Sequence, residues 1–69
     1  MKTVEMLVDD RGDLLRAAWR DGDPTVDLSL WRGTTCRATF RLALDDAARL
    51  TQLLAAALAG STATPPTPA

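Results

Sequence analysis

The chain has 69 residues, 46% of them hydrophobic, and a formal net charge of −1. This length accommodates one small domain, and the apolar share is that of a folded chain rather than a disordered one. The sequence has no histidine or tyrosine and a single cysteine, so it offers no Ser-His or Cys-His nucleophile, no internal disulfide and too few ligands for a tetrahedral zinc site. We therefore expect no enzymatic activity, no metal and no other cofactor.

The first two thirds of the chain alternate between apolar and polar residues in four short segments separated by turns rich in Asp and Gly. These segments are residues 3–8, 13–20, 25–32 and 34/35–42. Alternation at period two, bounded by turn residues, is typical of antiparallel strands joined by hairpins. The sequence thus predicts a four-stranded antiparallel β-meander.

After the fourth segment the apolar period changes to that of a helix. The apolar positions are Ala47, Leu50, Leu53, Leu54, Ala57 and Leu58. Asp45 is a good N-cap and Gly60 a good C′ residue, so they bound the predicted helix. The expected fold is α+β, ββββα, with the helix packed on one face of the sheet. Residues 1–60 would form the single domain and residues 61–69, which are only Ser, Thr, Ala and Pro, a disordered tail.

The predicted turn lengths decide which residues share a face of the sheet. The expected cross-strand pairs are Leu7 with Leu14, Ala17 with Leu28, and Leu30 with Cys36. A two-residue loop in the third hairpin would bring Arg37 among the apolar residues, so a three-residue loop is favoured. The inner face then consists of Val4, Met6, Leu15, Ala17, Trp19, Val26, Leu28, Leu30, Cys36, Ala38, Phe40 and Leu42.

The opposite face of the sheet combines an apolar strip with arginines. An exposed apolar patch of this kind indicates a contact surface, and Arg is enriched at protein interfaces. The free flank of the helix adds a further leucine. The expected partner or dimer interface therefore comprises Trp31, Leu14, Leu7, Arg16, Arg37, Arg41 and Leu53.

The size of the domain and its charge narrow the classes of partner. A core built from about 60 residues is small for a stable monomer, so we expect a homodimer. Arginines around an aromatic ring are also found where single-stranded nucleic acid binds, which gives the alternative of a single-stranded nucleic-acid-binding transcription cofactor. Glu5 and Asp27 lie among the arginines in the predicted register, and with the net charge they disfavour direct nucleic-acid binding.

The sequence also predicts a cellular compartment. Lys2 and mixed polar residues follow Met1, with no apolar signal-peptide segment, and the apolar stretch 53–59 is too short for a bilayer. A lone cysteine fits a reducing compartment. We expect a cytoplasmic protein without a membrane partner.

The run LSLWRGTTCRATFRL at residues 28–42, followed by DDAARL at residues 45–50, resembles the small BldB-like proteins of actinomycetes. The resemblance covers residues 14–58, and LSLWRG…C…TFRL is its most specific part. Those proteins are short regulators of development and antibiotic production. The resemblance implies a self-associating protein, without a DNA-binding motif of its own, that modulates a helix-turn-helix transcription regulator in development or secondary metabolism.

Overall fold

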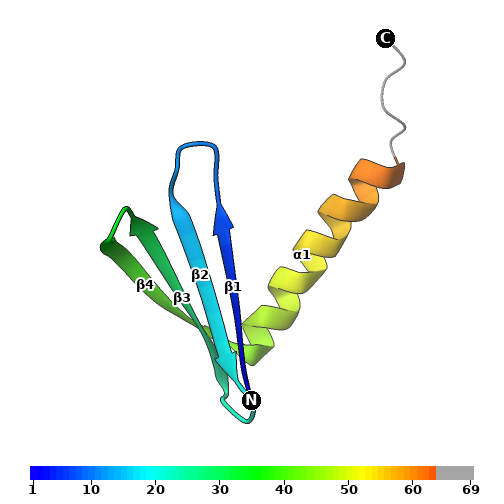
Figure 1. Cartoon of the computed structure of the whole chain (residues 1–69). Coiled ribbons are helices and arrows are strands. Elements are labelled where there is room, and N and C mark those ends of the chain that lie inside the picture. The colour runs from blue at the N-terminus through cyan, green and yellow to red at the C-terminus, as the bar shows by residue number, and fades with distance from the viewer. Residues whose placement is uncertain (64–69) are drawn as a thin grey trace.

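A computed structural model of the chain describes residues 1–63 and shows one sheet followed by one helix (Figure 1). The elements are β1 (Lys2–Val8), β2 (Leu14–Arg20), β3 (Thr25–Arg32), β4 (Thr35–Ala43) and α1 (Leu44–Ala63). The strands are antiparallel and lie in the order β1-β2-β3-β4, which confirms the predicted meander and the ββββα order. Of the predicted tail, residues 61–63 are the end of α1, and residues 64–69 lie outside the described part.

The register of the first hairpin differs by one residue from the prediction. Leu7 lies opposite Leu15, and Leu14 lies opposite Val8. The reason lies in the turn between the two strands. There the Asp9 carboxylate accepts hydrogen bonds from the backbone N–H groups of Arg11 (2.9 Å) and Asp13 (3.0 Å). Such a side-chain clamp fixes a five-residue loop, and a one-residue slip moves every side chain of β1 to the other face.

Of the other two hairpins, the second has the predicted register and the third does not. In the second, Ala17 lies opposite Leu28. In the third, β3 and β4 are joined by a two-residue turn rather than three residues, and a bulge follows, because Leu30 pairs with Ala38 while the next residue of β3 pairs with Cys36. Arg37 is the extra residue of the bulge. The bulge lets a short turn coexist with an apolar face, an option that uninterrupted pairing does not offer.

Residues directly opposite each other in antiparallel strands share a face, so these registers define two faces. The leucine face consists of Thr3, Glu5, Leu7, Leu15, Ala17, Trp19, Val26, Leu28, Leu30, Ala38, Phe40 and Leu42. The tryptophan face includes Lys2, Val4, Met6, Val8, Leu14, Arg16, Ala18, Arg20, Asp27, Ser29, Trp31, Cys36, Thr39 and Arg41. Val4, Met6 and Cys36, which were expected on the inner face, thus lie on the opposite one. Cys36 is exposed.

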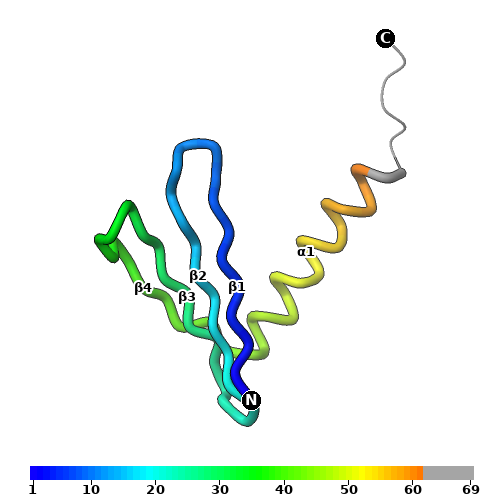
Figure 2. Tube along the Cα trace, in the orientation of Figure 1, coloured from blue at the N-terminus to red at the C-terminus, as the bar shows by residue number. Residues whose placement is uncertain are grey.

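The helix does not pack across the sheet as expected. It starts with Leu44 immediately after the last residue of β4, and it then diverges from the strands (Figures 1 and 2). The backbone N–H of Leu44 donates to the carbonyl of Pro24 (3.1 Å), which anchors the first turn beside the β2–β3 turn. A helix that folds back on a sheet needs a connection of about 2–6 residues to reverse the chain, and here there is none.

The predicted helix ends are also shifted. Asp45 lies in the first turn rather than at the N-cap, where with Asp46 it still favours the positive end of the helix dipole. Gly60 lies inside α1 rather than after it, and it does not have a positive φ, unlike the glycines of the three hairpin turns.

Within the described residues the only buried hydrophobic side chain is Ala18, which is 8% exposed. A single chain therefore has almost no core.

Candidate interaction surfaces

The leucine face is an open apolar surface at its centre. Leu15, Leu28, Leu30, Ala38, Thr39 and Phe40 line a shallow depression of about 290 Å³. Phe40 is 61% exposed and Leu30 46% exposed, although both were expected in the core. Fully burying one such side chain contributes roughly 1.5–3 kcal/mol, so leaving this face in water forgoes most of the stabilisation available to the sheet.

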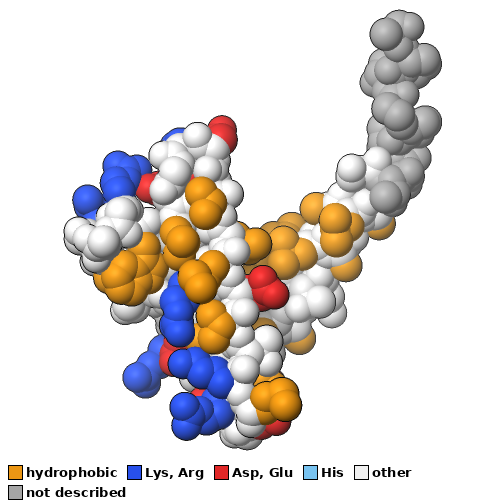
Figure 3. All heavy atoms as spheres, viewed as in Figure 1, with side chains coloured by type: hydrophobic (Ala, Val, Ile, Leu, Met, Phe, Trp, Pro, Cys, Tyr) orange, Lys and Arg blue, Asp and Glu red, His pale blue; other side chains and the backbone are white. Residues whose placement is uncertain are grey.

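A second apolar surface runs along α1. Its leucines recur at helical spacing, and Leu53, Leu54 and Leu58 are all more than half exposed. Figure 3 shows hydrophobic side chains exposed along the helix. Among helix residues 44–61, only Ala47, close to the start of the helix, is half-buried. The helix thus presents an apolar stripe that is largely exposed in the described part of the chain.

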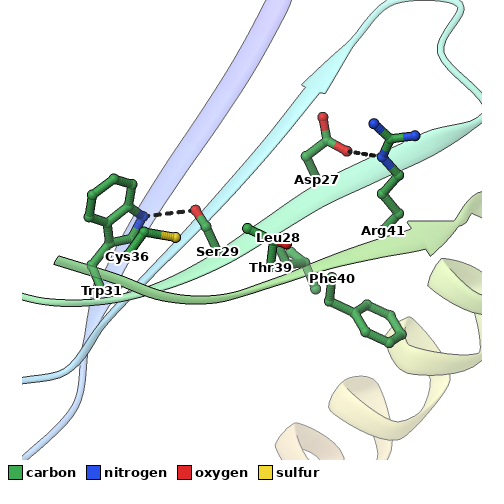
Figure 4. Close-up of a pocket in the computed structure, with 8 residues that line it drawn as sticks. All are labelled: Asp27, Leu28, Ser29, Trp31, Cys36, Thr39, Phe40 and Arg41. Carbon is green, nitrogen blue, oxygen red and sulfur yellow. Dashed lines mark hydrogen bonds and ion pairs between the residues drawn. The ribbon is translucent and has the colours of Figure 1, made fainter.

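The tryptophan face has a different character at the end where β3 finishes. Trp31 lies opposite Leu14, which lies opposite Val8, so an apolar strip crosses three strands. The indole N–H of Trp31 donates to the hydroxyl of Ser29 (2.9 Å), which satisfies the polar atom of the ring and fixes its orientation (Figure 4). A ring held in this way loses little conformational entropy when a partner contacts it.

A shallow pocket of about 380 Å³ adjoins the tryptophan ring and extends along β3 and β4. At its other end Arg41 and Asp27 form an ion pair of 3.8 Å, in which both side chains are largely exposed. Figure 4 shows Trp31 and this ion pair on one side of the strands and Phe40 on the other, toward α1. An exposed pair of this kind contributes little to stability, which leaves both groups available to a partner.

The part of the tryptophan face that carries Lys2, Arg16 and Arg20 is basic. Arg16 lies opposite Met6 and Ser29, not opposite Glu5 as predicted, because the slip of β1 moves Glu5 to the leucine face. Among residues 1–63, neither Arg16 nor Arg20 forms an ion pair. In Figure 3 the Lys and Arg side chains gather over this part of the sheet. The face is thus more positive than the sequence reasoning implied.

A small network of charges braces the sheet beside the tryptophan ring. Arg32 donates two hydrogen bonds to the carboxylate of Asp13, from Nε (2.7 Å) and from Nη2 (3.1 Å). This fork holds the pKa of Asp13 below its ordinary value and raises that of Arg32. The hydrogen bond from the backbone N–H of Asp13 is the main reason that the pKa of Asp9 is also lowered. The network ties the β1–β2 turn to the end of β3.

The structure brings together only part of the interface predicted from the sequence. Trp31, Leu14, Arg16 and Arg41 share the tryptophan face. Of the other predicted residues, Leu7 lies on the leucine face, Arg37 lies at the bulge and Leu53 lies on the helix. Val8 and Met6, both about 60–66% exposed, take the place beside Leu14 and Arg16 that sequence reasoning assigned to Leu7 and Glu5. The signal that could have located them is the carboxylate of Asp9 at the turn.

Metal-binding clusters and membrane-spanning helices are both absent from the described residues. No group of three or more His, Cys, Asp or Glu side chains is placed to hold a metal ion within residues 1–63. No helix in that range combines the length and apolar character needed to cross a membrane. Comparisons of the chain with protein-family models, with curated proteins and with solved structures found no match.

Proposed function

We propose that this chain is a non-enzymatic regulatory protein that acts through protein–protein contacts as a cytoplasmic homodimer. The observation that carries the proposal is the near absence of a core: one buried hydrophobic side chain among the described residues, against two exposed apolar surfaces. A domain of about 60 residues typically buries only about 60% of the surface that its unfolded chain exposes and is marginally stable, and a second copy can add the burial that this chain lacks. The chains of an obligate dimer fold and associate together. The leucines that are exposed in a single chain would therefore be buried in the folded dimer.

The tryptophan face is the surface we assign to the regulated partner. It has an aromatic anchor whose N–H is already satisfied, an apolar neighbour, and Arg41 at the other end of the same pocket, a composition typical of interface hot spots. The partner class comes from the resemblance to BldB-like proteins, which points to a helix-turn-helix transcription regulator in development or secondary metabolism. An acidic patch on that regulator would complement Arg16 and Arg20.

The test is an affinity capture from the native cytoplasm with and without nuclease. We expect a helix-turn-helix regulator to be captured in both samples and to be lost with Trp31→Ala. Arg49→Ala is the matched control, since this exposed helix residue pairs only with Asp46 within the described chain, and it should retain the partner. Captured material that is nucleic acid, and is removed by nuclease, would contradict the proposal.

Single-stranded nucleic-acid binding remains a second candidate because one observation favours it. The slip of β1 removes Glu5 from the tryptophan face and leaves Arg16 and Arg20 there without an acidic partner among residues 1–63. Binding of a labelled single-stranded oligonucleotide would weaken steeply with salt, and Arg16→Ala would reduce the slope by about one. Binding that is absent at low salt, or independent of salt, would exclude this candidate.

A further inference from the structure

The connection between sheet and helix restricts where the helix can lie. Residue 43 ends β4 and Leu44 begins α1, so no loop separates the two elements. The hydrogen bond from the Leu44 N–H to the Pro24 carbonyl fixes the first turn of the helix against the sheet. A helix held in this way cannot turn back to cover the leucine face of its own chain. Short connections without slack are those that favour exchange of an element between copies.

The two uncovered surfaces match each other in length. The 20 residues of α1 extend over about 30 Å, and strands of seven to nine residues extend over about 23–30 Å. Leu50, Leu54 and Leu58 follow one another at four-residue spacing on the helix, so they form a continuous stripe about 12 Å long. Such a stripe is long enough to cross the central depression of the leucine face, in which Leu28 and Leu30 lie about 7 Å apart along β3.

The two surfaces also match in polarity. The residues that line the central depression of the leucine face carry no charge, and the side chains that they place on this face are all apolar, since the side chain of Thr39 belongs to the tryptophan face. The stripe of α1 is likewise uncharged, and the charged residues of the helix, Asp45, Asp46 and Arg49, lie in its first two turns. A partner with charges at its centre would lose their hydration without compensation, whereas a second apolar helix would not.

We infer that the chain forms a two-fold symmetrical dimer in which α1 of each copy packs on the leucine face of the other. A second copy of the chain provides a helix to cover the leucine face of the first copy. Its own leucine face at the same time covers the helix that the first copy leaves exposed. Taken over the full length of α1, the footprint of such a helix is about 300 Å² on each surface, and the exchange covers four surfaces. The total of about 1,200 Å² reaches the lower end of the range for stable interfaces. The inference rests on the homodimer of the proposed function and specifies its architecture.

Lengthening the connection tests this architecture directly. An insertion of Gly-Ser-Gly-Asn-Gly between Ala43 and Leu44 should let α1 fold back onto its own sheet and convert the dimer to a monomer of half the mass. The same insertion within the β3–β4 turn, after Gly33, is the matched control, because α1 is anchored beside a different turn, and it should leave the dimer intact. Light scattering at micromolar concentration measures both masses. A dimer that survives the first insertion, or a wild-type chain that is monomeric, would overturn the inference.

Cross-linking gives a second, independent readout that does not depend on how the inserted chain folds. In a Cys36→Ser background, one preparation carries Leu54→Cys and the other Leu28→Cys, and the two are unfolded and refolded together. A short bismaleimide should join one chain of each kind. The control pairs Leu54→Cys with Ser29→Cys, which lies on the other face of the same strand and should give no product. Reaction of the control pair alone would refute helix exchange, while the partner capture described above would still decide the proposed regulatory function.

Discussion

The two faces of the sheet are built from alternate residues of the same strands, yet they are suited to different contacts. The centre of the leucine face carries aliphatic and aromatic side chains and almost no polar atoms. The tryptophan face carries comparable apolar residues, but arginines, the carboxylate of Asp27 and a hydrogen-bonded indole lie among them. Obligate dimer interfaces resemble a protein core, whereas interfaces that form and separate mix apolar anchors with polar groups. The leucine face is therefore suited to permanent burial, and the tryptophan face is suited to a partner that binds reversibly.

Introducing a charge should separate the two faces by the largest effect. Phe40 and Thr39 are neighbours in β4 that point to opposite faces. Phe40→Asp would place an unpaired carboxylate in the dimer interface, and such a charge costs about 3–5 kcal/mol, enough to dissociate and unfold a small chain. Denaturant unfolding and light scattering measure the effect.

Thr39→Asp is the matched control for that substitution. It adds the same charge one residue away on the tryptophan face, beside arginine side chains and open to water. We expect a change in unfolding free energy within about 0.5 kcal/mol and an unchanged mass. If the two variants lost stability equally, the division of the sheet into two kinds of surface would be wrong.

Truncating the two tryptophans should have smaller effects, one on partner binding and the other on stability. Trp31→Ala should weaken binding of the regulator by about 2 kcal/mol, or about 30-fold in Kd, while the dimer stays folded. Trp19 lies on the leucine face, half-buried, and its N–H donates to the carbonyl of Asp23 (3.0 Å), so Trp19→Ala should instead destabilise the domain. Titration calorimetry and thermal unfolding distinguish the two. Unfolding of the Trp31 variant would mean that its face is structural.

The smallest effect concerns the charge network beside the tryptophan ring. The pKa values of Asp9 and Asp13 are lowered in the folded chain, so their contribution to stability is fully present above the ordinary carboxyl value of 3.8 and is lost as pH falls through the lowered values. Asp13→Asn should reduce this acid-dependent loss, measured by thermal unfolding below about pH 5. Asp10→Asn, which removes a carboxylate without a hydrogen bond in the described chain, should leave it unchanged. Identical pH profiles for all three proteins would show that the network does not couple to folding.

The strands and their order followed from the sequence because both depend on local features. Alternation at period two and the Asp- and Gly-rich turns locate the four strands within one residue of where they lie, and the second register follows from its loop length. The first and third registers were wrong for a shared reason. Each depends on one local interaction, the Asp9 carboxylate in one turn and the bulge at Arg37 in the other. Neither changes the hydrophobic pattern from which the prediction was made.

Those two errors explain which interface residues were correctly grouped. Trp31, Leu14, Arg16 and Arg41 depend on the central strands and on the part of β4 beyond the bulge, and they lie on one face as expected. Leu7 depends on the first register and lies on the other face. Moving Glu5 together with Leu7 also changed the electrostatic character of the tryptophan face, so a turn residue far from the arginines determines how positive that face is.

The sequence by itself determined the four strands, the helix and the separation of apolar from mixed side chains, because each of these is encoded in the spacing of neighbouring residues. Only the tertiary structure decided where the helix goes. An amphipathic stripe states that a helix must be covered and says nothing of what covers it. The direct passage from β4 into α1 leaves the chain no residues with which to reverse, and for this geometric reason the helix diverges from its own sheet.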